Sequence, residues 1–171
     1  KRPAKNRQKD KDARWTKKHG RSHFGYKNHV CIDRRHKLVR RYGVTSASVH
    51  DSQKFDDLLD PTNTASTVWA DSAYRSKEAE EKLATRGFKS RIHRRGCRGK
   101  PLTARQESAN KTRSSVRARV EHVFGSQHTS MGGKLVRTIG IVRASMKIGM
   151  QNLAYNMRRL VVLERGTLTP A

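Results

Sequence analysis

Acidic residues are scarce in this chain. Of its 171 residues, 39 are Lys or Arg and only 14 are Asp or Glu, which gives a formal net charge of +25. A protein with so large a positive charge is suited to binding a polyanion, and nucleic acid is the first candidate. The same scarcity makes any carboxylate inside a basic or apolar stretch informative.

Other absences narrow the class of protein. The two cysteines, Cys31 and Cys97, lack C-x-x-C spacing, so neither a disulfide framework nor a structural zinc site is indicated. No apolar run approaches the roughly 20 residues needed to span a bilayer, and no signal-peptide pattern opens the chain. Motifs of zinc hydrolases, phosphate-binding loops and serine-nucleophile elbows are also missing. We therefore expect a soluble, cytoplasmic protein that does not contact membranes.

The composition predicts one modest folded domain with a basic N-terminal arm and a short C-terminal tail. Residues 1–23 contain many Lys and Arg and almost no aliphatic residue, which predicts a flexible basic arm. Residues 24–163 form the expected domain, and residues 164–171 a C-terminal tail.

Hydrophobic periodicity predicts an α/β fold. Alternation over residues 24–32 and 38–45 indicates two antiparallel strands, and residues 67–70, 77–86 and 89–93 read as strand, helix and strand. Two helices follow. The first lies near residues 103–127 and is either continuous or broken once, and the second lies near residues 141–163. We expect each to bury one apolar stripe, formed by Val116, Val120, Val123 and Phe124 in the first and by Ile148, Leu153, Met157 and Leu160 in the second.

Two acidic residues stand where metal ligands would be useful. Asp71 follows the apolar run 67–70, at the expected carboxyl end of a strand, and Glu121 lies in the middle of a helix. Cleavage of a phosphodiester by two divalent ions needs carboxylates that converge from different elements, because the ions lie about 3.5–4 Å apart and prefer hard oxygen ligands. We predict that these two carboxylates meet.

Each of these residues also has an ordinary interpretation. Arg117 lies four residues before Glu121, and an exposed ion pair at this spacing is common on helices. Asp71 could bond to its own turn. Tyr74 could either pack on the sheet or stack on a base. His128 shares the helix face of Glu121 and could hold DNA.

Seven segments of the chain resemble the DDE transposases of bacterial insertion sequences, within the fifth-insertion-sequence-like group. The two that carry the acidic residues are VWADSAY (68–74) and RARVEHVFG (117–125). The others are KDARWT (11–16), GYKNH (25–29), VHDS (49–52), VRTIG (136–140) and NLAYN (152–156). The resemblance therefore spans nearly the whole chain.

The resemblance implies a fold, a reaction and a set of site residues. The fold would be ribonuclease-H-like, a mixed sheet flanked by helices, which uses two Mg²⁺ or Mn²⁺ ions to cut DNA and join the freed 3′ hydroxyl to a target. Asp71 and Glu121 would be metal ligands, with Arg117 as a catalytic cation, and Arg117, His128 and Tyr74 would contact DNA. The partners would be transposon ends, target DNA and a second subunit in a homodimer, in the bacterial cytoplasm at the nucleoid. Ser114 and His128 replace the tyrosine and the lysine of the family signature.

One family residue has no counterpart here. The first catalytic aspartate of the family lies on a first strand that precedes the basic segment 1–23. We therefore expect a sheet lacking that strand, and a chain that binds DNA but is inactive by itself. Two alternatives remain, a noncatalytic basic nucleic-acid-binding protein of ribosomal or nucleoid type, and a chain that folds poorly because a sheet edge is exposed.

Overall fold

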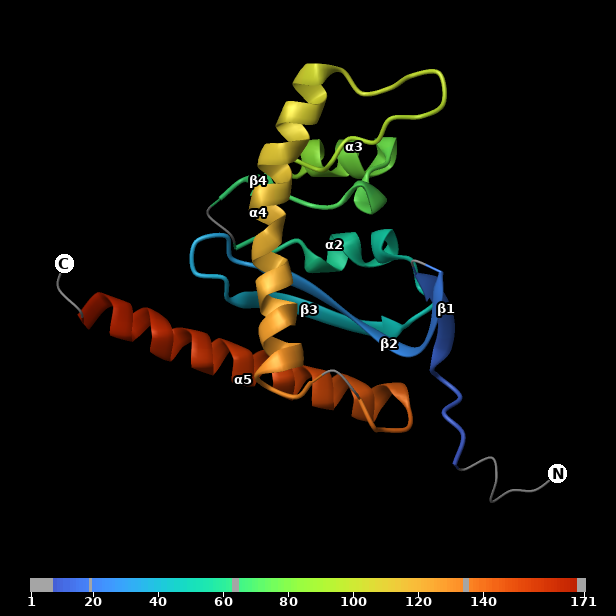
Figure 1. Cartoon of the computed structure of the whole chain (residues 1–171), viewed down its shortest axis with the longest axis vertical. Helices are drawn as coiled ribbons and strands as arrows, with labels where there is room; N and C mark the ends of the chain where they lie inside the picture. The colour runs from blue at the N-terminus through green and yellow to red at the C-terminus, as the bar shows by residue number, and fades with distance from the viewer. Residues whose placement is uncertain (1–7, 19, 63–64, 134–135, 169–171) are drawn as a thin grey trace.

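The strands form two small sheets in the computed structural model, which describes residues 8–18, 20–62, 65–133 and 136–168 (Figure 1). The first sheet is antiparallel and consists of β1 (Arg14–Lys18), β2 (Arg21–Ile32) and β3 (Val39–Ser46), in that order. The second is a parallel pair, β4 (Thr67–Val68) and β5 (Lys89–Ser90). The α/β class and the antiparallel hairpin are confirmed. The described strands are split between two sheets, whereas one mixed sheet was expected.

Six helical segments complete the described fold, and local sequence signals account for the starts of α3 and α4. They are η1 (Asp51–Lys54), α2 (Phe55–Leu58), η2 (Ser72–Tyr74), α3 (Lys77–Thr85), α4 (Ala104–Thr129) and α5 (Ile141–Leu168). The Ser76 side chain caps α3, and Thr103 with Gln106 forms a capping box that starts α4. α4 runs without a break over 26 residues.

Two apolar clusters hold these elements together. The first contains Phe55, Leu59, Leu83 and Ile92 and joins α2 and α3 to the parallel pair β4–β5. The second contains Val39, Val123 and Tyr155 and joins β3, α4 and α5. In Figure 1, α2 and α5 lie on opposite sides of the antiparallel sheet, and the long α4 extends from α5 past β4. α4 therefore carries side chains to the ends of both sheets.

The ends of the chain differ from the sequence prediction. The segment 1–23 was expected to be a flexible arm, but residues 14–18 form β1, and β2 already begins at Arg21. Trp15 packs on Phe24 at 5.2 Å between ring centroids, and Asp10 accepts a hydrogen bond of 2.7 Å from the Tyr26 hydroxyl. The basic composition of residues 14–18 did not predict this strand. Residues 164–168 continue α5, whereas residues 1–7, 19 and 169–171 lie outside the described residues.

α5 has two apolar faces. Its inner face contributes the buried residues Ala144, Ile148 and Tyr155. Leu153, Met157 and Leu160, which were expected in the core, lie instead on the outer face and are 49–63 % exposed. The outer face consists of Val142, Met146, Met150, Leu153, Met157, Leu160 and Val161. A helix that is apolar on both sides is typical of one covered on both sides.

A buried histidine in the antiparallel sheet predicts acid sensitivity. His29 is 4 % exposed, and its Nε2 lies 2.8 Å from the Thr45 hydroxyl. Burial lowers the pKa of His29 below its ordinary value of 6.5, while the Asp51 carboxylate opposes this shift. The unfolded chain therefore binds a proton at a higher pH than the folded chain, so the contribution of His29 to stability is complete above about pH 6.5 and falls at lower pH. Urea unfolding should show a decrease in stability between pH 7.5 and 5.5 that is smaller in His29→Gln; an equal decrease in both proteins would contradict this.

Candidate functional site

Arg117 connects the two carboxylates singled out from the sequence. Its Nη2 lies 3.1 Å from Oδ2 of Asp71 and 3.8 Å from Oε1 of Glu121. Because both oxygens contact one nitrogen, they can be no further apart than the sum of these distances, about 6.9 Å. Two residues separated by fifty positions in the sequence therefore lie at one place in the fold.

The positions of these side chains follow from the elements that carry them. Asp71 comes after β4 and caps η2, where its Oδ1 accepts hydrogen bonds from the backbone N–H of Ser72 at 2.6 Å and from the Ser72 hydroxyl at 3.3 Å. Its other oxygen is thus directed to Arg117. On α4, Arg117 and Glu121 are one turn apart. The ordinary interpretations, a turn aspartate and a helical ion pair, are both present, but the contact between Asp71 and Arg117 goes beyond them.

The three side chains are accessible to solvent. Arg117 is 29 % exposed, Asp71 45 % and Glu121 69 %. Ion pairs in such positions contribute about 1 kcal/mol or less to stability. A divalent cation or a phosphate can therefore compete for these groups without a large loss in the free energy of folding.

The two carboxylates fit part of a metal site. Mg²⁺ binds oxygen at about 2.0–2.1 Å, so one shared ion would require the two oxygens to lie within about 4 Å, whereas two ions about 3.5–4 Å apart could span the wider separation. No group of three or more His, Cys, Asp and Glu side chains suited to a metal occurs within the ranges that the structure describes. Asp71 and Glu121 thus offer hard oxygen ligands but not a complete set.

Tyr74 lies beside this site and is held in the first apolar cluster. Its ring packs against Phe55 at 5.3 Å between centroids. Burial raises the pKa of Tyr74 to about 12, and the negative charges of Asp51 and Asp71 act in the same direction. The hydroxyl therefore stays protonated, and one side of the ring is engaged by Phe55. Contact of Tyr74 with DNA stays a prediction.

His128 and His93 extend the site in different ways. His128 is exposed on α4, two turns or about 10 Å beyond Glu121, and its DNA contact stays a prediction.

Sequence reasoning missed His93, whose Nε2 is buried and has no hydrogen-bond partner among the described residues. Burial and then the charge of Arg117 lower the pKa of His93, while Asp71 opposes the shift. The available signal was its place after β5, because parallel strands end at one edge and Asp71 follows the neighbouring strand.

Comparison with known proteins identifies the family. The family model described as "Transposase DDE domain" matches residues 2–157. The chain is 32 % identical over 149 residues to the transposase for insertion sequence element IS1106 of Neisseria meningitidis serogroup B, an alignment that covers 87 % of this chain and 51 % of that protein. No solved structure matches the chain significantly.

The chain belongs to the DDE transposase family. It spans about half the length of the curated relative that it matches. Within the described residues, no helix is long and apolar enough to cross a membrane.

Proposed function

We propose that this chain acts on DNA in the transposition of an insertion sequence, with Mg²⁺ or Mn²⁺ held by Asp71 and Glu121. The observation that carries this proposal is the shared contact of both carboxylates with Arg117. When bound, two such ions would activate the attacking oxygen and stabilise the charge that develops on the phosphate during strand cleavage and strand transfer. The substrates would be transposon ends and target DNA, which implies a bacterial cytoplasmic protein at the nucleoid.

Each side chain has a distinct part in this proposal. Asp71 keeps one oxygen bonded to Ser72, which fixes the carboxylate, and presents the other. Glu121 is more exposed and can adjust toward a cation. Arg117 pairs with both carboxylates until a metal binds and can then pair with a phosphate, for which its planar guanidinium is suited.

The ribonuclease-H-like form of the fold is also part of the proposal. It is supported by the strand, helix and strand order of β4, α3 and β5 and by the antiparallel sheet beside them. β2 pairs with β1 only over residues 21–25, so no described strand covers that edge of residues 26–32. A further strand on this edge would extend the first sheet.

Mn²⁺ titration of purified protein tests the metal proposal. We expect Asp71→Asn and Glu121→Gln each to weaken Mn²⁺ binding by tenfold or more in isothermal titration calorimetry, because each removes a hard anionic ligand. Arg117→Gln should instead strengthen Mn²⁺ binding, by about tenfold, because a cation that competes for both carboxylates is removed.

The matched control is Asp57→Asn, which removes an exposed carboxylate paired with Lys54 at 2.8 Å on the separate helix α2. It should leave Mn²⁺ affinity unchanged. Equal affinities of the wild type, Asp71→Asn and Glu121→Gln would refute metal binding at this site. That result would favour the second candidate, a noncatalytic basic nucleic-acid-binding protein, which is supported by the net charge of +25.

We further propose that the outer face of α5 pairs with a second copy of this chain. Its seven apolar side chains are 45–70 % exposed. Each partner buries about 800 Å² in a standard interface, and a row of seven exposed apolar side chains can supply a large part of it. Six of them follow a spacing of four, four, three, four and four residues, from Val142 to Val161. This spacing is symmetric about its midpoint, so an antiparallel two-fold pair would place Met150 opposite Leu153 of the partner.

A further inference from the structure

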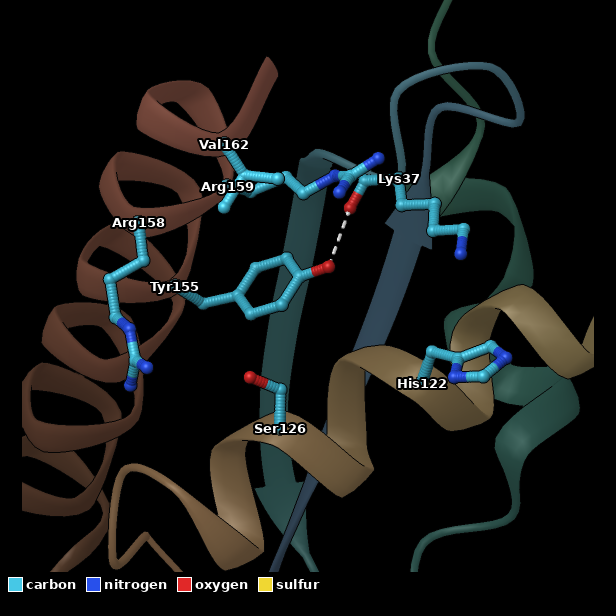
Figure 2. Close-up of a pocket in the computed structure, with 7 residues that line it drawn as sticks. All are labelled: Lys37, His122, Ser126, Tyr155, Arg158, Arg159 and Val162. Atoms are coloured by element: carbon cyan, nitrogen blue, oxygen red, sulfur yellow. Dashed lines mark hydrogen bonds between the residues drawn. The ribbon is translucent and has the colours of Figure 1, made fainter. Parts of the chain in front are cut away.

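A second candidate site, rich in basic side chains, lies between α4 and α5. A pocket of about 230 Å³ opens below the turn that joins β2 and β3 (Figure 2). It is lined by Lys37, His122, Ser126, Tyr155, Arg158, Arg159 and Val162. Figure 2 shows Ser126 and Tyr155 between Arg158 on one side and Lys37 and His122 on the other. No carboxylate is among the lining residues, so the pocket is a concentration of positive charge.

Hydrogen bonds fix the frame of this pocket. The Tyr155 hydroxyl donates to the Lys37 carbonyl at 3.0 Å, and Arg159 Nε donates to the His36 carbonyl at 2.8 Å. Arg158 Nη1 contacts the Ser130 carbonyl at 3.4 Å. A guanidinium has five N–H donors, so one such bond leaves donors for a ligand. The pocket thus has an ordered wall whose guanidinium groups can still donate hydrogen bonds to a ligand.

The backbone of Lys37 also indicates an ordered pocket wall. With φ of 61°, it is the only residue other than glycine within the described ranges that has a positive φ. This conformation is unfavourable for a residue with a side chain, by about 1–3 kcal/mol at most sites of this kind. The bond from Tyr155 to the Lys37 carbonyl helps to hold it, and the lysine side chain remains at the rim of the pocket.

The chemistry of the lining selects a phosphate. Collecting one Lys and two Arg side chains around one hollow is electrostatically unfavourable unless an anion occupies it. Guanidinium groups pair with phosphate oxygens through two parallel hydrogen bonds, and hydroxyl and ammonium donors complete such a site. The open shape suits one phosphate group of a larger chain.

The pocket and the candidate metal site share helix α4. His122 follows Glu121 directly, and Ser126 lies one turn further along α4. A strand whose scissile phosphate meets Asp71 and Glu121 would therefore pass this neighbouring face of α4. We propose that the pocket binds a backbone phosphate of that DNA strand, a proposal that rests on the proposed function for the identity of the ligand.

DNA binding in EDTA tests this subsite without involving the metal. We expect Lys37→Gln to weaken the binding of a fluorescent duplex by about tenfold at 0.1 M salt, and to reduce the slope of log affinity against log salt by about 1. The matched control Lys147→Gln removes the same charge from an exposed position on α5 that does not line the pocket, and it should change affinity less than twofold. A second pair removes a hydroxyl without changing charge: Ser126→Ala should weaken binding more than Ser115→Ala does.

The outcomes separate the possible ligands. Equal effects of Lys37→Gln and Lys147→Gln, together with no effect of Ser126→Ala, would overturn the proposal. Saturable binding of inorganic phosphate that is lost in Lys37→Gln, with unchanged DNA affinity, would also overturn it, because the pocket would then take a free phosphate. If Lys37→Gln acts as expected while Asp71→Asn leaves Mn²⁺ affinity unchanged, the phosphate subsite stands and the metal proposal fails.

Discussion

DNA binding should weaken by about 10³ to 10⁵ when the salt concentration rises from 50 to 200 mM, as expected for six to ten neutralised phosphates. The physical reason is the excess of 39 Lys and Arg over 14 Asp and Glu, which makes release of condensed counterions the main source of affinity. Fluorescence anisotropy of a labelled duplex over a salt series gives the slope directly.

Competition by heparin, a polyanion without bases, provides the control for this measurement. Heparin should displace DNA at low salt, whereas neutral dextran should not. A salt slope shallower than about −3 would mean that few phosphates are contacted. In that case the large positive charge would need another partner, and the phosphate pocket between α4 and α5 would lose its expected ligand.

The second large effect is expected at the outer face of α5. Met150→Glu should convert a dimer into a monomer and raise the dissociation constant at least 100-fold. By two-fold symmetry the substitution occurs twice in the interface. Each copy loses about 1.5–3 kcal/mol of stabilisation from apolar burial and introduces a charge that must be desolvated. Sedimentation velocity at 0.5 M NaCl, where repulsion between the basic copies is screened, measures the change.

Trp15→Glu is the matched control because Trp15 and Met150 are both 66 % exposed, and Trp15 lies on β1 rather than on α5. It should remain dimeric. The pairing geometry can be tested separately by replacing Cys31 and Cys97 with Ser and mixing Met150→Cys with Leu153→Cys. A disulfide between the two variants is expected for antiparallel helices. A wild-type protein that stays monomeric at 100 µM would contradict the pairing.

Local signals were sufficient to predict much of the fold. The caps at Ser76 and Thr103 fix the starts of α3 and α4, and alternation identifies the hairpin. β1 was missed because its sequence, RWTKK, has no aliphatic residue, so pairing with β2 rather than burial defines it. On α5, periodicity indicated an apolar stripe but not which side faces the sheet, since both sides are apolar.

The candidate site was predictable only in part. Asp71 and Glu121 stood out because carboxylates are scarce, and Arg117 because it lies one turn before Glu121. The contact of Arg117 with Asp71 depends on how α4 crosses the end of β4, which no local pattern encodes. The same holds for the pocket, whose residues come from a turn and two helices.

The most direct test of the central proposal is a crystal structure of the protein soaked in Mn²⁺, with anomalous scattering used to locate the ion. We expect either one anomalous peak within about 2.3 Å of carboxylate oxygens of both Asp71 and Glu121, or two peaks, each within that distance of one of them. The guanidinium of Arg117 should be displaced from both carboxylates. A peak elsewhere, or none at saturating Mn²⁺ while Arg117 still bridges the two carboxylates, would contradict the proposal.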